Sequence, residues 1–433
     1  MLPTPAVSPL PAVAAATFFG WKNLGLLFGV YLFAVGFVYY SFNVIFPEMV
    51  RETGWKRGDA AWAQTLHGVL FAAFVPLAAM LTNRLGARAT LAIGIGVLIA
   101  GCILLGTLTH SLLAWTILWG VVMAFGFALG GVIPIQTTVA QWFSLRRATA
   151  IGLVMSAAGL GGFLAQPLFT RVMENFGGWQ IGWLAATGFA AIALVLVAWV
   201  VNRPEDRGEH PDGIVPGSEA HARQHGAAQI HRTQELWTLA QALRTPTLWL
   251  LIVLFLGTVM PLYLLVVHGV LHLTDLGYDR MEAASVLSFM LAGSACARFP
   301  LGWLGDRVEP RLLLFCLLCA AAIALALIWQ APGMSWLLLA GVLFGAAYGG
   351  TLVLVPAVIA NYFGAVSFAS INGFVFPVQL VIASVIPVGA GYLADRSGSY
   401  DTSFIGLTGF AVLAAVCTLW TRPPTRPQTR SGH

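Results

Sequence analysis

The stretch LLLFCLLCAAAIALALI occupies residues 312–328 and contains no charged side chain. A helix rises about 1.5 Å per residue, so a run of this length nearly crosses the roughly 30 Å hydrocarbon core of a bilayer. Similar apolar runs recur along the chain between short polar breaks, and the chain is 58% hydrophobic and only 9% charged. Soluble domains carry about 25% charged residues. The sequence therefore predicts an all-α, polytopic membrane protein that has the lipid bilayer as its solvent.

Twelve predicted spans fall into two groups of six. The first group covers residues 20–46, 62–82, 87–108, 112–138, 148–173 and 179–201, and the second covers 246–272, 281–304, 310–330, 334–361, 367–392 and 403–421. We expect a disordered tail at 1–19, a six-helix half at 20–201, a solvated linker at 202–245, a second six-helix half at 246–421 and a tail at 422–433. Within the linker, residues 234–245 are predicted to form a short interfacial helix with Leu236, Trp237, Leu239 and Leu243 facing lipid.

Lysine and arginine are distributed unevenly over the loops. If both termini and the linker are cytoplasmic, about fifteen of the 22 lie inside and about six outside. Because cytoplasmic loops are enriched in these residues, this is the orientation we expect. The basic residues form no continuous stripe, so nucleic acid is not an expected partner despite the net charge of +5.

Several function classes lack their sequence signals. The five cysteines lie in apolar runs as small core residues, and no disulfide, metal site or cofactor is expected. No GxSxG, HExxH or P-loop pattern occurs, and no pair of acidic residues lies within a predicted span. We therefore do not expect an enzyme.

Two loops carry related patterns, GWLGDRVEPR (302–311) and AMLTNRLGAR (79–88). With the two groups of six spans, they resemble the loop signature of the major facilitator superfamily, approximately GxxxDRxGRR, which implies that fold. An Asp at a helix end can accept hydrogen bonds from the N-terminus of a neighbouring helix and latch one conformation. Asn83 stands where the family has Asp, so the first copy lacks the charge; ordinary topogenic charge is the alternative interpretation. The predicted latch residues are Asn83, Arg84, Arg146, Arg147, Gly302, Asp306 and Arg307.

Longer segments narrow the resemblance. QWFSLRRATAIGLVMSAAGLGG (141–162), NRPEDRGEHPDG (202–213), ANYFGAVSFASINGFVF (360–376) and GYLADRSGSYDTSF (391–404) resemble the oxalate/formate antiporter and monocarboxylate transporter group. The resemblance implies a transporter of small organic anions, as a bacterial member in the cytoplasmic (inner) membrane. Gly152, Gly159, Gly161 and Gly162 give one helix a bare surface, for either a sliding interface or static close packing.

Arg298 stands inside a predicted span, about 12 Å from the loop that follows it. An arginine at mid-helix costs about 2.5–3.5 kcal/mol on insertion scales. Its planar guanidinium matches a carboxylate, and the resemblance implies the same role; snorkelling to the interface is the alternative. Ser294 stands where animal-type carriers have an Asp, and residues 36–49 and 367–392 contain no Lys. One cation suits a monocarboxylate better than a dianion.

Other polar side chains in the spans are candidates for the same site or for helix–helix hydrogen bonds: Tyr39, Tyr40, Asn43, His67, Gln136, Gln166, Tyr348, Asn372 and Gln379. His268 and His272 are four apart, which suits outer gating or proton sensing better than a metal site without a third ligand.

The sequence thus predicts a secondary active transporter of a small monocarboxylate that works by alternating access, with Arg298 binding the carboxylate. The second solute is a proton or a counter-anion, and anion exchange is favoured because no carboxylate lies beside Arg298. An efflux transporter for other small molecules and a transporter-like sensor are the alternatives. The identity of the acid, the direction of transport and the oligomeric state stay open.

Overall fold

The computed structural model describes residues 18–215, 230–233 and 235–425. Within these residues the secondary structure is helical, and twelve helices are long and apolar enough to cross a membrane. Ten of the twelve predicted spans need only small shifts at their ends. The first and eleventh extend furthest, to Thr53 and Ser397.

The first half contains six spans. The first span joins α1 (Gly20–Tyr31), the π-helical η1 (Leu32–Phe37) and α2 (Phe42–Thr53). The second and third are α3 (Arg57–Leu85) and α4 (Ala87–Leu108). The fourth is divided into α5 (Leu112–Ile117), the π-helical η2 (Leu118–Met123), α6 (Ala124–Gly130) and α7 (Val132–Trp142). The long α8 (Arg147–Phe176) and α9 (Gly178–Val197) complete this half.

Short helical turns η3 (Pro204–Arg207) and η4 (Pro211–Gly213) and the helix α11 (Leu239–Leu243) belong to the linker. The second half contains α12 (Pro246–Asp275), α13 (Arg280–Gly305), α14 (Pro310–Gln330) and α15 (Met334–Phe363). Its fifth span is divided into α16 (Phe368–Ser384) and α17 (Ile386–Ser397), and α18 (Asp401–Cys417) with the short turn η5 (Thr418–Trp420) forms the last.

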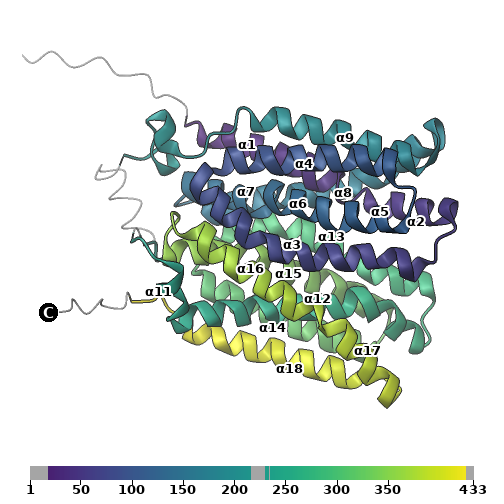
Figure 1. The fold of residues 1–433 in the computed structure, drawn as a ribbon. Helices are drawn as coiled ribbons and strands as arrows, with labels where there is room; N and C mark the ends of the chain where they lie inside the picture. Colours follow the sequence, from purple (N-terminus) through teal and green to yellow (C-terminus); the bar gives the residue numbers. More distant parts are fainter. Residues whose placement is uncertain (1–17, 216–229, 234, 426–433) are drawn as a thin grey trace, which may run out of the picture.

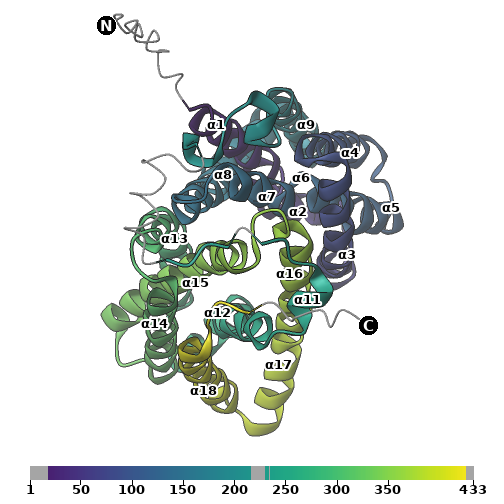
Figure 2. The same cartoon turned by 90° about the vertical axis from the view of Figure 1, so that its left-hand side faces the viewer.

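The two halves form separate bundles that lie side by side (Figure 1). The first span begins and the last span ends at the same end of the molecule, where α11 also lies (Figure 1). We call this the linker end and the opposite one the far end. Seen from the linker end, α8 lies beside α13 and α3 beside α16 (Figure 2), and these two pairs make the main contacts between the halves.

Close helix packing inside the second half depends on three glycines of α15, Gly341, Gly345 and Gly349. A Cβ at Gly341 would lie 2.7 Å from the Val286 carbonyl oxygen of α13, and Cβ atoms at the other two would meet the Met290 and Ser294 backbone. The spacing of four residues puts all three glycines on one face. This GxxxGxxxG pattern lets the two backbones approach closely, as small residues do between membrane helices.

Parts of the predicted tails and linker lie outside the described residues, namely 1–17, 216–229, 234 and 426–433. Phe18 and Phe19, predicted as tail, instead pack against Trp142 with ring centroids 5.8 and 5.9 Å away. The prediction that Trp237 faces lipid is wrong. Its side chain is only 5% exposed and packs edge-on against Phe363, because the linker turns inward onto the second half.

Candidate functional site

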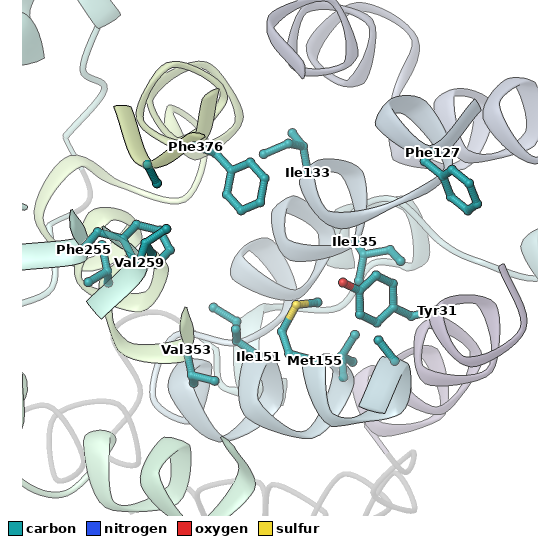
Figure 3. Packing of buried hydrophobic residues seen from close by; sticks show 14 of the residues in the cluster. Tyr31, Phe127, Ile133, Ile135, Ile151, Met155, Phe255, Val259, Val353 and Phe376 are labelled. Carbon is teal, nitrogen blue, oxygen red and sulfur yellow. The ribbon is translucent and has the colours of Figure 1, made fainter. Parts of the chain in front are cut away.

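In the described part of the chain, the hydrogen bonds that join the two halves involve residues in the part of the bundle nearer the linker end. At the linker end Arg147 Nη1 donates to Asn361 Oδ1 at 2.6 Å. Deeper in the bundle, Asn372 Nδ2 of α16 donates to Gln136 Oε1 of α7 at 3.0 Å, and both residues are buried. Side chains from both halves, among them Tyr31, Met155, Val259 and Phe376, face the interior between the bundles (Figure 3).

Arg298 lies at this inter-half surface, seven residues before the last residue of α13. Its Nη1 donates to the Met155 carbonyl oxygen of α8 at 2.6 Å, and its Nη2 is 3.4 Å from Ser294 Oγ. The guanidinium makes no ion pair with any described residue, and its Nε is enclosed without a partner. Arg298, the residue predicted to bind the carboxylate, therefore has only neutral hydrogen-bond partners among the described residues.

Two tyrosines, one from the first span and one from α15, lie near Arg298. Tyr31 and Tyr348 lie within electrostatic range of the guanidinium, and both lie near Tyr40. Tyr263 of α12 is close to Tyr348. Within the described residues, these four hydroxyl groups form no intramolecular hydrogen bond, so they are free to bind a polar ligand.

Tyr31 and Tyr263 are site candidates that sequence reasoning missed. Tyr31 and Tyr40 are nine positions apart, and an uninterrupted α-helix would place such residues on opposite faces. The π-helical segment Leu32–Phe37 and the turn at 38–41 interrupt the helix between them. π-helical turns often occur at functional sites, and broken membrane helices mark binding sites in transporters. The Tyr31 hydroxyl points toward Met155 (Figure 3).

The remaining polar candidates do not all converge on Arg298. His67 is 3% exposed, contacts the Trp119 carbonyl oxygen through Nδ1 at 2.9 Å and stacks on the Trp119 ring, so it packs within the first half. Tyr39 joins the same aromatic cluster and accepts a bond from Gln64 at 3.4 Å. Gln136 and Asn372 bond each other, Gln379 is buried with an unpartnered Oε1, and Asn43 and Gln166 are exposed.

The predicted latch residues show a marked difference between the halves. Asp306 accepts hydrogen bonds from the Ala148 amide at 2.9 Å, the Thr149 amide at 2.7 Å and Thr149 Oγ1 at 2.6 Å, all at the start of α8. Burial raises the pKa of the Asp306 carboxyl, although these bonds act in the opposite direction. Asn83 makes a single bond, from Nδ2 to Ser370 Oγ at 2.7 Å.

The basic latch candidates also differ from one another. Arg147 is buried and bonds the Phe143, Ala140 and Asn361 oxygens. Arg146 is exposed over the Trp21 ring, and Arg307 lies over the Trp303 ring with its centroid 3.8 Å away. Arg84 is exposed. Among the predicted latch arginines, the described contacts join the halves only through Arg147.

The four glycines of α8 that give it a surface without side chains face two different neighbours. A Cβ at Gly152 would meet the Arg298 carbonyl group, one at Gly159 would lie 3.0 Å from the Ala295 Cβ, and one at Gly302 would meet the Ala148 carbonyl. These glycines therefore let α8 and α13 approach across the two halves. Gly161 and Gly162 instead face Gly36 and Tyr40 of the first span, which is close packing within one half.

The two histidines of α12 lie at the far end with separate partners. His268 contacts the Tyr400 hydroxyl at 3.1 Å and the Pro387 carbonyl oxygen at 2.9 Å, whereas His272 contacts the Ile328 carbonyl oxygen at 3.3 Å. No group of three metal-binding side chains occurs among the described residues.

Comparisons with known proteins place the chain among transporters. A family model described as Major Facilitator Superfamily matches residues 28–291 and 270–433. Monocarboxylate transporter 12 of Rattus norvegicus is 28% identical over 388 residues, 86% of this chain and 79% of that protein. Monocarboxylate transporter 3 of the same organism is 30% identical over 405 residues, 92% of this chain and 78% of that protein.

Among solved structures, the E. coli fucose:proton symporter FucP matches with a TM-score of 0.71 at 14% identity, covering 94% of this chain and 100% of that one. The human organic anion transporter TETRAN matches with a TM-score of 0.68 at 15% identity, covering 92% and 99%. Such low identities support the fold alone. The resemblance to the major facilitator superfamily and its monocarboxylate transporters, inferred from the sequence patterns, is confirmed by the family model and by the named relatives.

Proposed function

The chain belongs to the Major Facilitator Superfamily, and we propose that it is a secondary active transporter of a small monocarboxylate that works by alternating access. Its similarity to proteins named monocarboxylate transporters supports the substrate class. Arg298 is proposed to bind the carboxylate, with Ser294 and the nearby tyrosine hydroxyls as further donors. No role in catalysis is proposed.

The position and partners of Arg298 carry this proposal. A guanidinium within a membrane-spanning helix is costly unless its donors are used, and Arg298 has neutral partners at the surface between the halves. A carboxylate would accept two parallel hydrogen bonds from the fork and neutralise its charge. A single cation balances one carboxylate, so a dianion would bring an unpaired charge into the membrane.

Other candidates have separate proposed roles. Tyr348 lies near Arg298 and Tyr40 lies near Tyr348, and both are proposed as substrate ligands together with the newly placed Tyr31 and Tyr263. Tyr39, His67, Gln136, Asn372 and Gln379 are proposed to shape the surrounding interior, and Asn43 is proposed to line the far-end approach. We propose that Asp306, helped by Gly302 and Arg147, latches the linker end, with Asn83 as a weaker counterpart; Arg84, Arg146 and Arg307 set topology.

We further propose that the linker end faces the cytoplasm of a bacterium and that the protein lies in its inner membrane. The charge distribution over the loops supports this orientation. Because the described inter-half hydrogen bonds lie on the linker side, the conformation then corresponds to a carrier closed toward the cytoplasm. We propose anion exchange as the transport mode, with proton symport as the rival.

Uptake by proteoliposomes tests the function. Radiolabelled lactate, pyruvate, formate and glycolate are offered to vesicles that contain the purified protein. We expect saturable uptake of at least one acid, and Arg298→Ala should abolish it while Arg298→Lys retains part of it. Arg244→Ala is the matched control, because Arg244 is an exposed linker arginine. Normal uptake by Arg298→Ala would refute the assigned role of Arg298.

A further inference from the structure

Arg298 belongs to α13 in the second half, whereas its shortest hydrogen bond reaches the Met155 carbonyl oxygen of α8 in the first half. The bond is 2.6 Å long and has a charged donor. Hydrogen bonds with one charged partner are roughly twice as strong as neutral ones. The group proposed to bind the substrate therefore also joins the two halves.

The local sequence of α8 explains why a backbone oxygen inside a helix is within reach. Gly152 lies one turn before Met155 and Gly159 one turn after it, and both face α13. A Cβ at Gly152 would collide with the Arg298 carbonyl group, and one at Gly159 would lie 3.0 Å from the Ala295 Cβ. The two glycines bring the helices together on both sides of Met155, so the guanidinium can reach its carbonyl oxygen.

The side chain of Met155 continues the connection. Gln136 Nε2 lies 3.4 Å from Met155 Sδ, and Gln136 Oε1 accepts the bond from Asn372 of the second half. Met155 thus lies between two inter-half contacts, one charged and one neutral. Only the charged contact involves a group that a carboxylate would bind.

We propose that the hydrogen bond from Arg298 to the Met155 carbonyl oxygen holds the two halves together in the empty carrier, and that the substrate carboxylate breaks it. We call this hydrogen bond the bolt. This inference rests on the proposed function, because it assumes that the carboxylate binds Arg298. A carboxylate is a stronger acceptor than a backbone carbonyl and takes both Nη atoms in a bidentate pair. In this proposal the bidentate pair draws the guanidinium away from α8 and so breaks the Nη1 bond to Met155, and the linker end then separates more easily when the site is occupied. The Gln136–Asn372 bond and the Asp306 contacts remain to be broken in both states.

The test measures the empty protein, so it does not depend on knowing the substrate. Spin labels are attached at Arg84→Cys and Val366→Cys, two exposed linker-end positions in different halves, with the native cysteines replaced by serine. Pulsed EPR gives the ratio of long to short inter-label distances in a buffer without carboxylates. Arg298→Met should raise this ratio by roughly 10-fold to 100-fold, the loss expected for one hydrogen bond from a charged group. Arg298→Ala gives the same test if the Met variant does not fold.

Arg244→Met is the control and should leave the ratio unchanged. An unchanged ratio in a folded Arg298→Met or Arg298→Ala protein would overturn the bolt, even if both variants fail to transport. Conversely, variants that transport normally would refute the proposed binding of the substrate carboxylate by Arg298, whatever their distance ratio. The two failures are therefore distinguishable.

Discussion

Replacing Asp306 by Asn should weaken the closed linker end. In the structure Asp306 accepts two amide N–H bonds and one hydroxyl bond at the first turn of α8. Asn has nearly the same shape, but it keeps only one acceptor oxygen and turns an NH2 group toward donors. The substitution also removes a negative charge from the positive end of a helix dipole.

The size of the effect follows from two opposing contributions. Hydrogen bonds to a charged group contribute about 1.5–3 kcal/mol each, so losing the bond to the oxygen that the NH2 group replaces, and making the remaining bonds neutral, would cost several kcal/mol. Burial opposes this, since the pKa of the Asp306 carboxyl is raised and the neutral Asn avoids the desolvation cost of the charge. We therefore expect a net loss of about 2 kcal/mol, which shifts the closed-to-open ratio by roughly 30-fold.

The assay is the distance between spin labels at Arg84→Cys and Val366→Cys in the empty protein. Asp306→Asn should increase the long-distance population, and Arg307→Ala should leave it unchanged, because Arg307 lies over Trp303 and bonds its carbonyl oxygen. A distance distribution identical to that of the wild type would show that the three bonds do not hold the halves together.

Four further results are expected. Asn83→Asp should favour the closed linker end by about 1 kcal/mol in the same distance measurement, because it restores a charged acceptor near α16; a more open protein would contradict this. Gly345→Val should lower thermal stability by about 1–3 kcal/mol through overpacking against α13, whereas Gly389→Ala, with open space around it, should not. Tyr31→Phe should weaken substrate binding about 2-fold to 10-fold in a binding titration with a normal melting temperature; unchanged affinity would remove Tyr31 from the site. Internal substrate should accelerate uptake into liposomes severalfold, and concentrative uptake driven by a pH gradient alone would contradict exchange.

The membrane helices were predictable because composition and hydrophobic length act locally. The run at residues 312–328 needs no partner to be identified as a span, and α14 (Pro310–Gln330) has the bounds expected from sequence. The Asp306 contact was also predictable, since an acid in a loop next to a helix start has a local electrostatic reason to bind there. Hydropathy could not place Trp237, because its burial depends on how the linker folds back onto the second half.

The candidate site was less predictable, because it depends on the distance between helices. Sequence identified Arg298 from the cost of a charge in a span, but nothing local identified the Met155 carbonyl oxygen as its partner. That contact requires Gly152 and Gly159 of α8 to face α13. The sequence shows four glycines in this helix but does not indicate that Gly161 and Gly162 face the first span instead. Tyr31 was missed for a related reason, because regular helical periodicity places it opposite Tyr40 until a π-helical segment rotates the chain.

The contacts of Arg298 change the argument for exchange. Sequence alone predicts that the empty carrier holds an unpaired buried cation, whose cost would slow its reorientation. In the structure that cation has a partner, so the empty state is stabilised and not strained. Reorientation of the empty carrier must now break a charged inter-half bond, while the loaded carrier has already exchanged it for the substrate. Both arguments make the loaded carrier faster, but they differ for an arginine-free variant. The unpaired-charge argument predicts that Arg298→Met leaves the closed state equally or more stable, whereas the bolt predicts that the linker end opens.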